Sequence, residues 1–77
     1  MKSYTFDEIK EFVRRIENKK LVETKEILLL QDKNGDSVAH WLSIRHSTWI
    51  TDDLEILSLA NRGGRTVEDI LIRAGKI

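Results

Sequence analysis

Apolar residues recur along this chain at helical spacing, in stretches separated by short polar segments. The first stretch carries a single apolar stripe, formed by Phe6, Ile9, Phe12, Val13 and Ile16. Positions three and four residues apart share one face of an α-helix, so this stripe predicts a helix that ends near Asn18. Thr5 and Glu8 have the spacing of a capping box, in which each side chain accepts a hydrogen bond from the backbone N–H of the other.

The same pattern predicts four more helices, over residues 22–30, 38–45, 52–60 and 67–74. Three of them follow expected N-caps, which are Ser37, Thr51 and Thr66. A hydroxyl at the N-cap can accept from a free N–H in the first turn of a helix. We therefore expect an all-α protein of about five helices.

One segment occurs twice, because residues 25–42 match residues 54–71 at an offset of 29. An acidic residue, an Ile-Leu-x-Leu run, a glycine, a valine and a final leucine are in register between the copies. Self-similarity at such a period predicts helical units that stack and share a core. We expect one domain with approximate units at 1–31, 32–60 and 61–77.

Composition narrows the classes of function. The 77 residues suffice for one small domain, and the 13 basic and 13 acidic side chains cancel. A neutral chain has no overall field that would attract nucleic acid or an anionic membrane. Cysteine is absent, which excludes disulfides and thiolate metal sites, and the longest apolar run, residues 27–30, is too short to cross a bilayer. We expect a cytoplasmic protein that does not contact membranes.

Two segments resemble the start of an ankyrin repeat, whose pattern is D-x-x-G-x-T-P-L-H-x-A. Residues 32–40 read Asp-Lys-Asn-Gly-Asp-Ser-Val-Ala-His, and residues 61–69 are similar to the variant of a terminal repeat. Residues 54–57, Leu-Glu-Ile-Leu, match the start of the second helix of that family. The resemblance covers about residues 32–75 and implies a short helical-repeat (ankyrin-like) stack that binds another protein.

The chain departs from the ankyrin pattern at several positions. Val38 and Val67 stand where the family has proline, and the connector over residues 46–53 is longer than the usual turn. The G-A-D-V-N segment of the projecting β-hairpin is missing, so the second helix is expected to run almost directly into the next turn. A generic bundle of helical hairpins with similar caps is therefore the alternative fold.

No residue pattern in the chain indicates catalysis. In ankyrin-like repeats the histidine equivalent to His40 bonds to the backbone across the repeat junction, which implies a structural role for it. Zinc would need two or three further ligands, and His46 does not share a helix face with His40. No serine has the flanking G-x-S-x-G signature of an activated nucleophile. We expect no enzyme activity, no metal and no cofactor.

A helix-turn-helix regulator of nucleic acid is the alternative function. Residues 54–60 and 66–73, joined by a glycine turn, would place Arg62, Arg65 and Arg73 near phosphates. Two observations weigh against it, namely the acidic first turn of the second helix and the zero net charge. Nucleic acid is therefore not the expected partner.

The expected partner is another protein, with this chain as a small inhibitor or adaptor. The ankyrin resemblance implies contacts from the turns and from the outer face of each first helix. On this chain the matching positions are Lys33, Asn34, Asp36, Ile44, Arg45, Arg62 and Arg65.

Two tryptophans and three isoleucines are further residues that could contact a partner if they are exposed. Trp41 matches Ile70 in the second copy, which indicates a core or half-buried position. Trp49 lies in the connector, where it either covers the core or stands as an exposed binding anchor. A homodimer is the other candidate assembly, in which a second copy would cover Ile70, Ile72 and Ile77.

Overall fold

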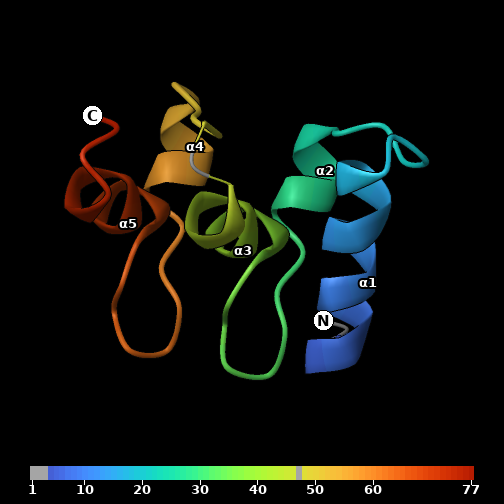
Figure 1. Ribbon diagram of the computed structural model, residues 1–77. Helices are drawn as coiled ribbons and strands as arrows, with labels where there is room; N and C mark the ends of the chain where they lie inside the picture. The colour runs from blue at the N-terminus through green and yellow to red at the C-terminus, as the bar shows by residue number, and fades with distance from the viewer. Residues whose placement is uncertain (1–3, 47) are drawn as a thin grey trace.

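The computed structural model describes residues 4–46 and 48–77, and these residues form five helices and no β-sheet (Figure 1). The helices are α1 (Phe6–Glu17), α2 (Lys25–Leu28), α3 (Val38–Arg45), α4 (Leu54–Leu57) and α5 (Val67–Arg73). α3 lies between α1 and α5 and packs against both, while α2 packs on α3 and α4 packs on α5. The long helices thus follow one another in the order α1, α3, α5, and each short helix packs on the long helix that follows it in the chain.

The expected N-caps of α1, α3 and α5 are confirmed. Thr5 Oγ1 accepts from the Glu8 N–H at 3.2 Å, and Glu8 Oε1 accepts from the Thr5 N–H at 3.0 Å. Ser37 and Thr66 cap α3 and α5 in the same reciprocal way. These local contacts satisfy N–H groups that the helix itself leaves without partners, and they fix where each long helix begins.

The predicted lengths of the second and fourth helices are wrong. Instead of residues 22–30 and 52–60, only single turns form. Thr24 is the N-cap of α2, and Asp53 rather than the expected Thr51 is the N-cap of α4. Backbone pairing explains the early ends. The Leu30 carbonyl accepts from the Val38 N–H at 3.1 Å, and an equivalent bond at 3.3 Å joins residues 59 and 67.

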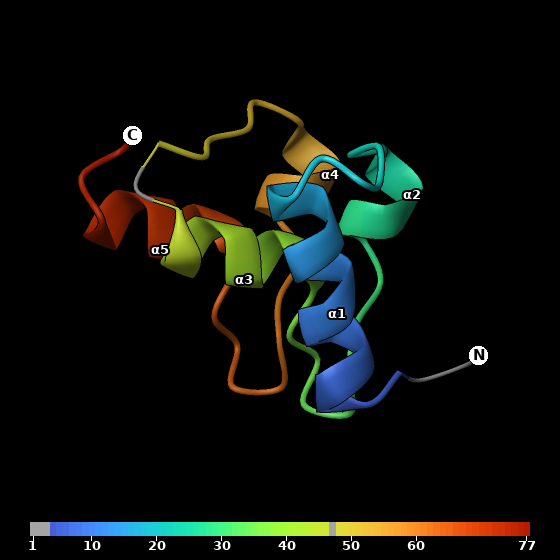
Figure 2. The same ribbon diagram turned by 45° about the vertical axis from the view of Figure 1, so that its right-hand side comes forward.

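Two narrow loops follow these single-turn helices, so the expectation of a direct passage from helix into turn is also wrong. The first loop (residues 29–37) and the second loop (residues 58–66) project to the same side of the helices (Figures 1 and 2). One antiparallel bridge closes each loop, between Gln31 and Ser37 and between Ala60 and Thr66. A projecting loop is therefore present although its sequence lacks the hairpin segment of the ankyrin family.

The two copies of the repeated sequence have matching hydrogen bonds in these loops. The Asp32 N–H donates to the Asp36 carbonyl at 2.9 Å, and the Asn61 N–H donates to the Arg65 carbonyl at 3.0 Å. The turn glycine of each copy donates to the carbonyl three residues before it, at 3.0 Å in both. Sequence similarity between the copies is thus accompanied by similarity of local structure.

All five helices contribute residues to the core. Its buried residues are Ile9, Val13, Leu28, Val38, Ala39, Leu42, Ile56, Val67 and Leu71. Two pairs of sequence-equivalent residues, Val38 with Val67 and Leu42 with Leu71, are among them. The matching positions of the copies are therefore largely caps, turns and core residues, which every unit of such a packing needs.

The C-terminal segment contacts the end of α3. The Lys76 ammonium donates to the Ser43 carbonyl at 2.9 Å and to the His46 carbonyl. The last carbonyls of a helix lack partners within it, and a cation at this end is favourable. Within residues 4–46 and 48–77, every helix is too short or too polar to cross a bilayer.

Candidate functional site

Hydrogen bonds join the tips of the two loops. The Arg62 N–H donates to the Asn34 carbonyl at 2.9 Å, and the Asn61 side-chain amide donates to Asp36 Oδ1 at 2.9 Å. The amide of Gln31 adds a third link, because it donates to the Ala60 carbonyl at 3.2 Å. Each loop therefore limits the motion of the other.

Asp32 stiffens the first loop from inside. Its side chain is 5% exposed, and Oδ1 accepts from the N–H groups of Asn34 at 2.8 Å and Asp36 at 3.1 Å. A side-chain oxygen that accepts from backbone N–H groups two and four residues later holds a turn in one conformation. The exposed side chains of this loop thus extend from an ordered backbone.

His40 anchors the second loop to α3. The imidazole is buried; Nδ1 accepts from the Ser37 N–H at 3.1 Å, and Nε2 lies 3.0 Å from the Arg65 carbonyl. Because Nδ1 accepts, the ring hydrogen is assigned to Nε2, which donates to that carbonyl. The expectation that His40 bonds to backbone across the junction of the two copies is confirmed.

The structure brings five of the predicted binding residues together on the loops. Lys33, Asn34, Arg62 and Arg65 are exposed, and Asp36 is half-buried. The remaining two helical positions, Ile44 and Arg45, are exposed at the far end of α3. A helix of that length separates its ends by roughly 12 Å, so these residues belong to a second part of the surface.

Trp49 covers the core. Its ring packs against the core cluster, and its Nε1–H donates to Glu23 Oε1 at 2.8 Å. Trp49 is therefore a cover of the core and not an exposed binding anchor. Trp41 is half-buried, as its match to Ile70 indicates. Ile70 itself is buried and unavailable to a second copy, whereas Ile72 and Ile77 are about half exposed.

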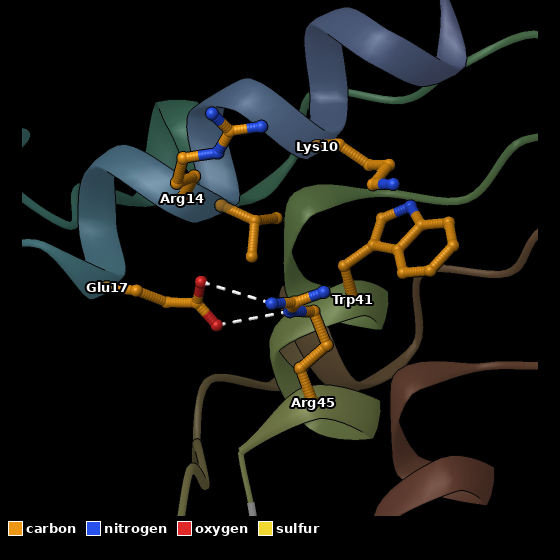
Figure 3. A pocket seen from close by; sticks show the side chains of 6 residues that line it. Lys10, Arg14, Glu17, Trp41 and Arg45 are labelled. Atoms are coloured by element: carbon orange, nitrogen blue, oxygen red, sulfur yellow. Dashed lines mark hydrogen bonds and ion pairs between the residues drawn. The ribbon is translucent and has the colours of Figure 1, made fainter.

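A pocket of about 150 Å³ opens between α1 and α3 (Figure 3). It is lined by Lys10, Val13, Arg14, Glu17, Trp41 and Arg45. At one end Glu17 accepts from Arg45 Nε at 3.1 Å, and His46 Nε2 lies 2.7 Å from the same carboxylate. The Arg45 hydrogen bond holds the pKa of Glu17 below its ordinary value of 4.5.

Sequence reasoning missed this pocket. The residues from α1 lie outside the duplicated segment, and Lys10 and Arg14 resemble ordinary solvated positions of an amphipathic helix. Only the packing of α1 against α3 places them beside Trp41. The available signal was the replacement of an aliphatic residue by tryptophan in one copy of the repeat.

Glu17→Gln is expected to change how stability depends on pH. The pKa of Glu17 in the folded state is lowered, so its ion pair contributes stability above about pH 4.5, and this contribution is lost as pH falls through the folded-state pKa. Urea unfolding midpoints measured from pH 3 to pH 7 should therefore converge for wild type and variant on the acidic side. Glu11→Gln, which removes two exposed ion pairs, with Arg14 and Arg15, should change the midpoints little. A constant difference at all pH values would contradict this assignment.

No family model, no curated protein and no solved structure matches the chain. Among the residues that the structure describes, no group of three or more His, Asp or Glu side chains could hold a metal ion.

Proposed function

We propose that this chain is a non-catalytic protein-interaction module, built as an ankyrin-like stack of helix pairs, whose contact surface is the joined tips of the two loops. The observation that carries the proposal is the set of hydrogen bonds between the loops. These bonds satisfy backbone groups and leave Lys33, Arg62 and Arg65 exposed on an ordered frame. An ordered surface loses less conformational entropy when a partner binds.

The ankyrin-like part of the proposal is supported by the loops themselves. Both copies pair a one-turn helix with a projecting loop and a longer capped helix, and both have the same loop hydrogen bonds. His40 makes the contact across the junction that the family resemblance implies. The chain would thus be a short repeat protein that presents its loops to a partner.

The charges on the loops suit a polar and specific interface. Lys33, Arg62 and Arg65 are basic, and Asp36 between them is held by Asn61. Complementary charges mainly raise specificity and the rate of association. A small module of this kind would act as an inhibitor or adaptor that covers a site on a larger cytoplasmic protein.

The helix-turn-helix alternative has less support. α4 is a single turn, and Glu68 and Asp69 are exposed in the first turn of α5, where a recognition helix would contact bases. Acidic side chains at that position would repel phosphates. The arrangement therefore favours a protein partner.

Reversal of the loop charges tests the proposed function. The triple variant K33E/R62E/R65E should capture its partner from extracts of the native host at least about tenfold less well, because complementary contacts become repulsive. The matched control K19E/K20E/R73E changes equally many exposed cations away from the loops and should retain the partner. Circular dichroism should be unchanged in both variants.

Two outcomes would contradict the proposal. The loops would not be the contact surface if both triple variants captured the same proteins as wild type. Binding of the wild type to mixed-sequence DNA at low salt, with affinity falling steeply as salt rises, would favour the nucleic-acid alternative.

A further inference from the structure

A buried hydrogen-bond donor in the α1–α3 pocket has no acceptor. Trp41 Nε1 is shielded from solvent, and no acceptor for it lies among the residues described. An indole N–H can only donate, and a buried donor without a partner is costly. Figure 3 shows the indole nitrogen facing the end of the Lys10 side chain, which is also a donor.

The pocket has excess positive charge. Three cations and one carboxylate line the pocket, and that carboxylate, Glu17, lies at the other end against Arg45 (Figure 3). Arg14 has only a long ion pair, 3.8 Å from Glu11, and both of these side chains are well exposed. Lys10 and Arg14 therefore remain available to an anion that reaches Trp41.

Two aromatic rings provide apolar surface beside these donors. The rings of Phe6 and Trp41 pack edge to face with their centroids 5.1 Å apart, and Phe6 is 45% exposed. The Lys10 ammonium lies 5.3 Å from the Phe6 ring centroid. A ligand with a short aliphatic part and an anionic end would match this combination of ring surface and donors.

We propose that the pocket between α1 and α3 binds one carboxylate side chain of the partner protein. The carboxylate accepts from the Trp41 indole N–H and is paired with Lys10 and Arg14, while its methylene groups contact Phe6. This assignment rests on the proposed protein-binding function and names the chemistry of a second contact. The loops and the pocket would then engage different parts of one partner.

A single carboxylate fits better than the phosphates of a nucleic acid. Proteins that bind duplexes track several phosphates, whereas only two cations of this pocket, Lys10 and Arg14, lie outside the Glu17–Arg45 pair. Acidic residues surround them on the same helix, with Asp7 and Glu8 in the first turn of α1 and Glu11 beside Arg14. A polyanion would meet these side chains on either side of the pocket.

The two tryptophan indole groups provide the test. In a nitrogen–proton correlation spectrum, Trp41 and Trp49 each give one indole signal, and Trp49 serves as an internal control because its N–H already binds Glu23. The probe is the capped peptide acetyl-Ala-Leu-Glu-Leu-Ala-amide at low salt. It should move the Trp41 signal saturably, with a dissociation constant of about 1 mM or lower. The same peptide with Gln in place of Glu should bind at least about tenfold less tightly.

Variants localise the effect. K10Q/R14Q should weaken binding of the Glu peptide at least about tenfold, while the matched control K19Q/K20Q should leave it unchanged. The pocket proposal is overturned if the Trp41 signal stays still up to about 10 mM peptide or if Glu and Gln peptides bind equally. If a DNA oligonucleotide shifts the Trp41 signal with a lower dissociation constant than the peptide does, the pocket binds phosphate. That result would also overturn the pocket proposal.

Failure of this inference differs from failure of the proposed function. If K33E/R62E/R65E no longer captures the partner but the Glu peptide does not shift the Trp41 indole signal, only the pocket assignment is wrong. If the Glu peptide binds the pocket but loop reversal leaves capture unchanged, the loops are not the contact surface. The two experiments therefore report on separate surfaces.

Discussion

Gly35→Ala is expected to lower the free energy of unfolding by about 3 kcal/mol, whereas Gly64→Ala should cost about 1 kcal/mol. Both glycines have positive φ, 79° and 80°, so an added Cβ causes the same backbone strain at each. Their surroundings differ. A Cβ on Gly35 would lie 2.8 Å from the Arg62 backbone nitrogen and 3.0 Å from the Asn61 Cα, while a Cβ on Gly64 would meet nothing within 4 Å.

The difference between the two variants isolates the close approach of the loops. Urea unfolding of wild type and both variants gives the loss of unfolding free energy for each substitution. In thermal melting, each kcal/mol lost should lower Tm by roughly 4–8 °C in a domain of this size. Equal losses would mean that the loops are not in contact at Gly35. A larger loss at Gly64 would contradict the packing of the two copies outright.

His40→Ala is expected to cost about 3 kcal/mol, which makes it the second large effect. The substitution leaves a cavity in the core and removes the partners of the Ser37 N–H and the Arg65 carbonyl. The equivalent residue in the other copy, Asp69, forms only the local capping contact at an exposed position. Asp69→Ala should therefore cost about 1 kcal/mol.

Amide exchange distinguishes an anchoring role of His40 from general loss of stability. Without the His40 bond to Arg65, the second loop should open more readily than the rest, so the Asn61 amide should exchange faster relative to core amides such as Leu42. In Asp69→Ala this ratio should stay near that of wild type. Uniform acceleration in His40→Ala would show that the imidazole stabilises the core without anchoring the loop.

Sequence patterns predicted the long helices well because their signals are local. The caps at Thr5, Ser37 and Thr66 and the stripe through Ile9 and Val13 depend on neighbours within a few residues. The lengths of the short helices were overestimated because their ends depend on contacts outside the helix. Their apolar runs suit a longer helix, but backbone pairing across the loops ends each one after a single turn.

The candidate surface was predictable only in part. The loop residues Lys33, Asn34, Arg62 and Arg65 come from the two copies of one pattern, so the sequence alone grouped them. Trp49 was ambiguous between cover and anchor, since its position depends on Glu23 and the core beneath it. The only sequence signal of the α1–α3 pocket was Trp41 in place of an aliphatic residue, because the pocket joins segments about thirty residues apart.

By itself the sequence determined the helical class, the starts of the long helices, the turn glycines and the equivalence of the two copies. These properties follow from hydrogen bonds and side-chain spacing within a few residues, which any segment with that pattern can satisfy. Only the tertiary structure decided the lengths of α2 and α4, the joining of the loops and the placement of Trp41 beside Lys10. Each of these depends on contacts between residues far apart in the chain, whose geometry is set when the helices pack around a common core.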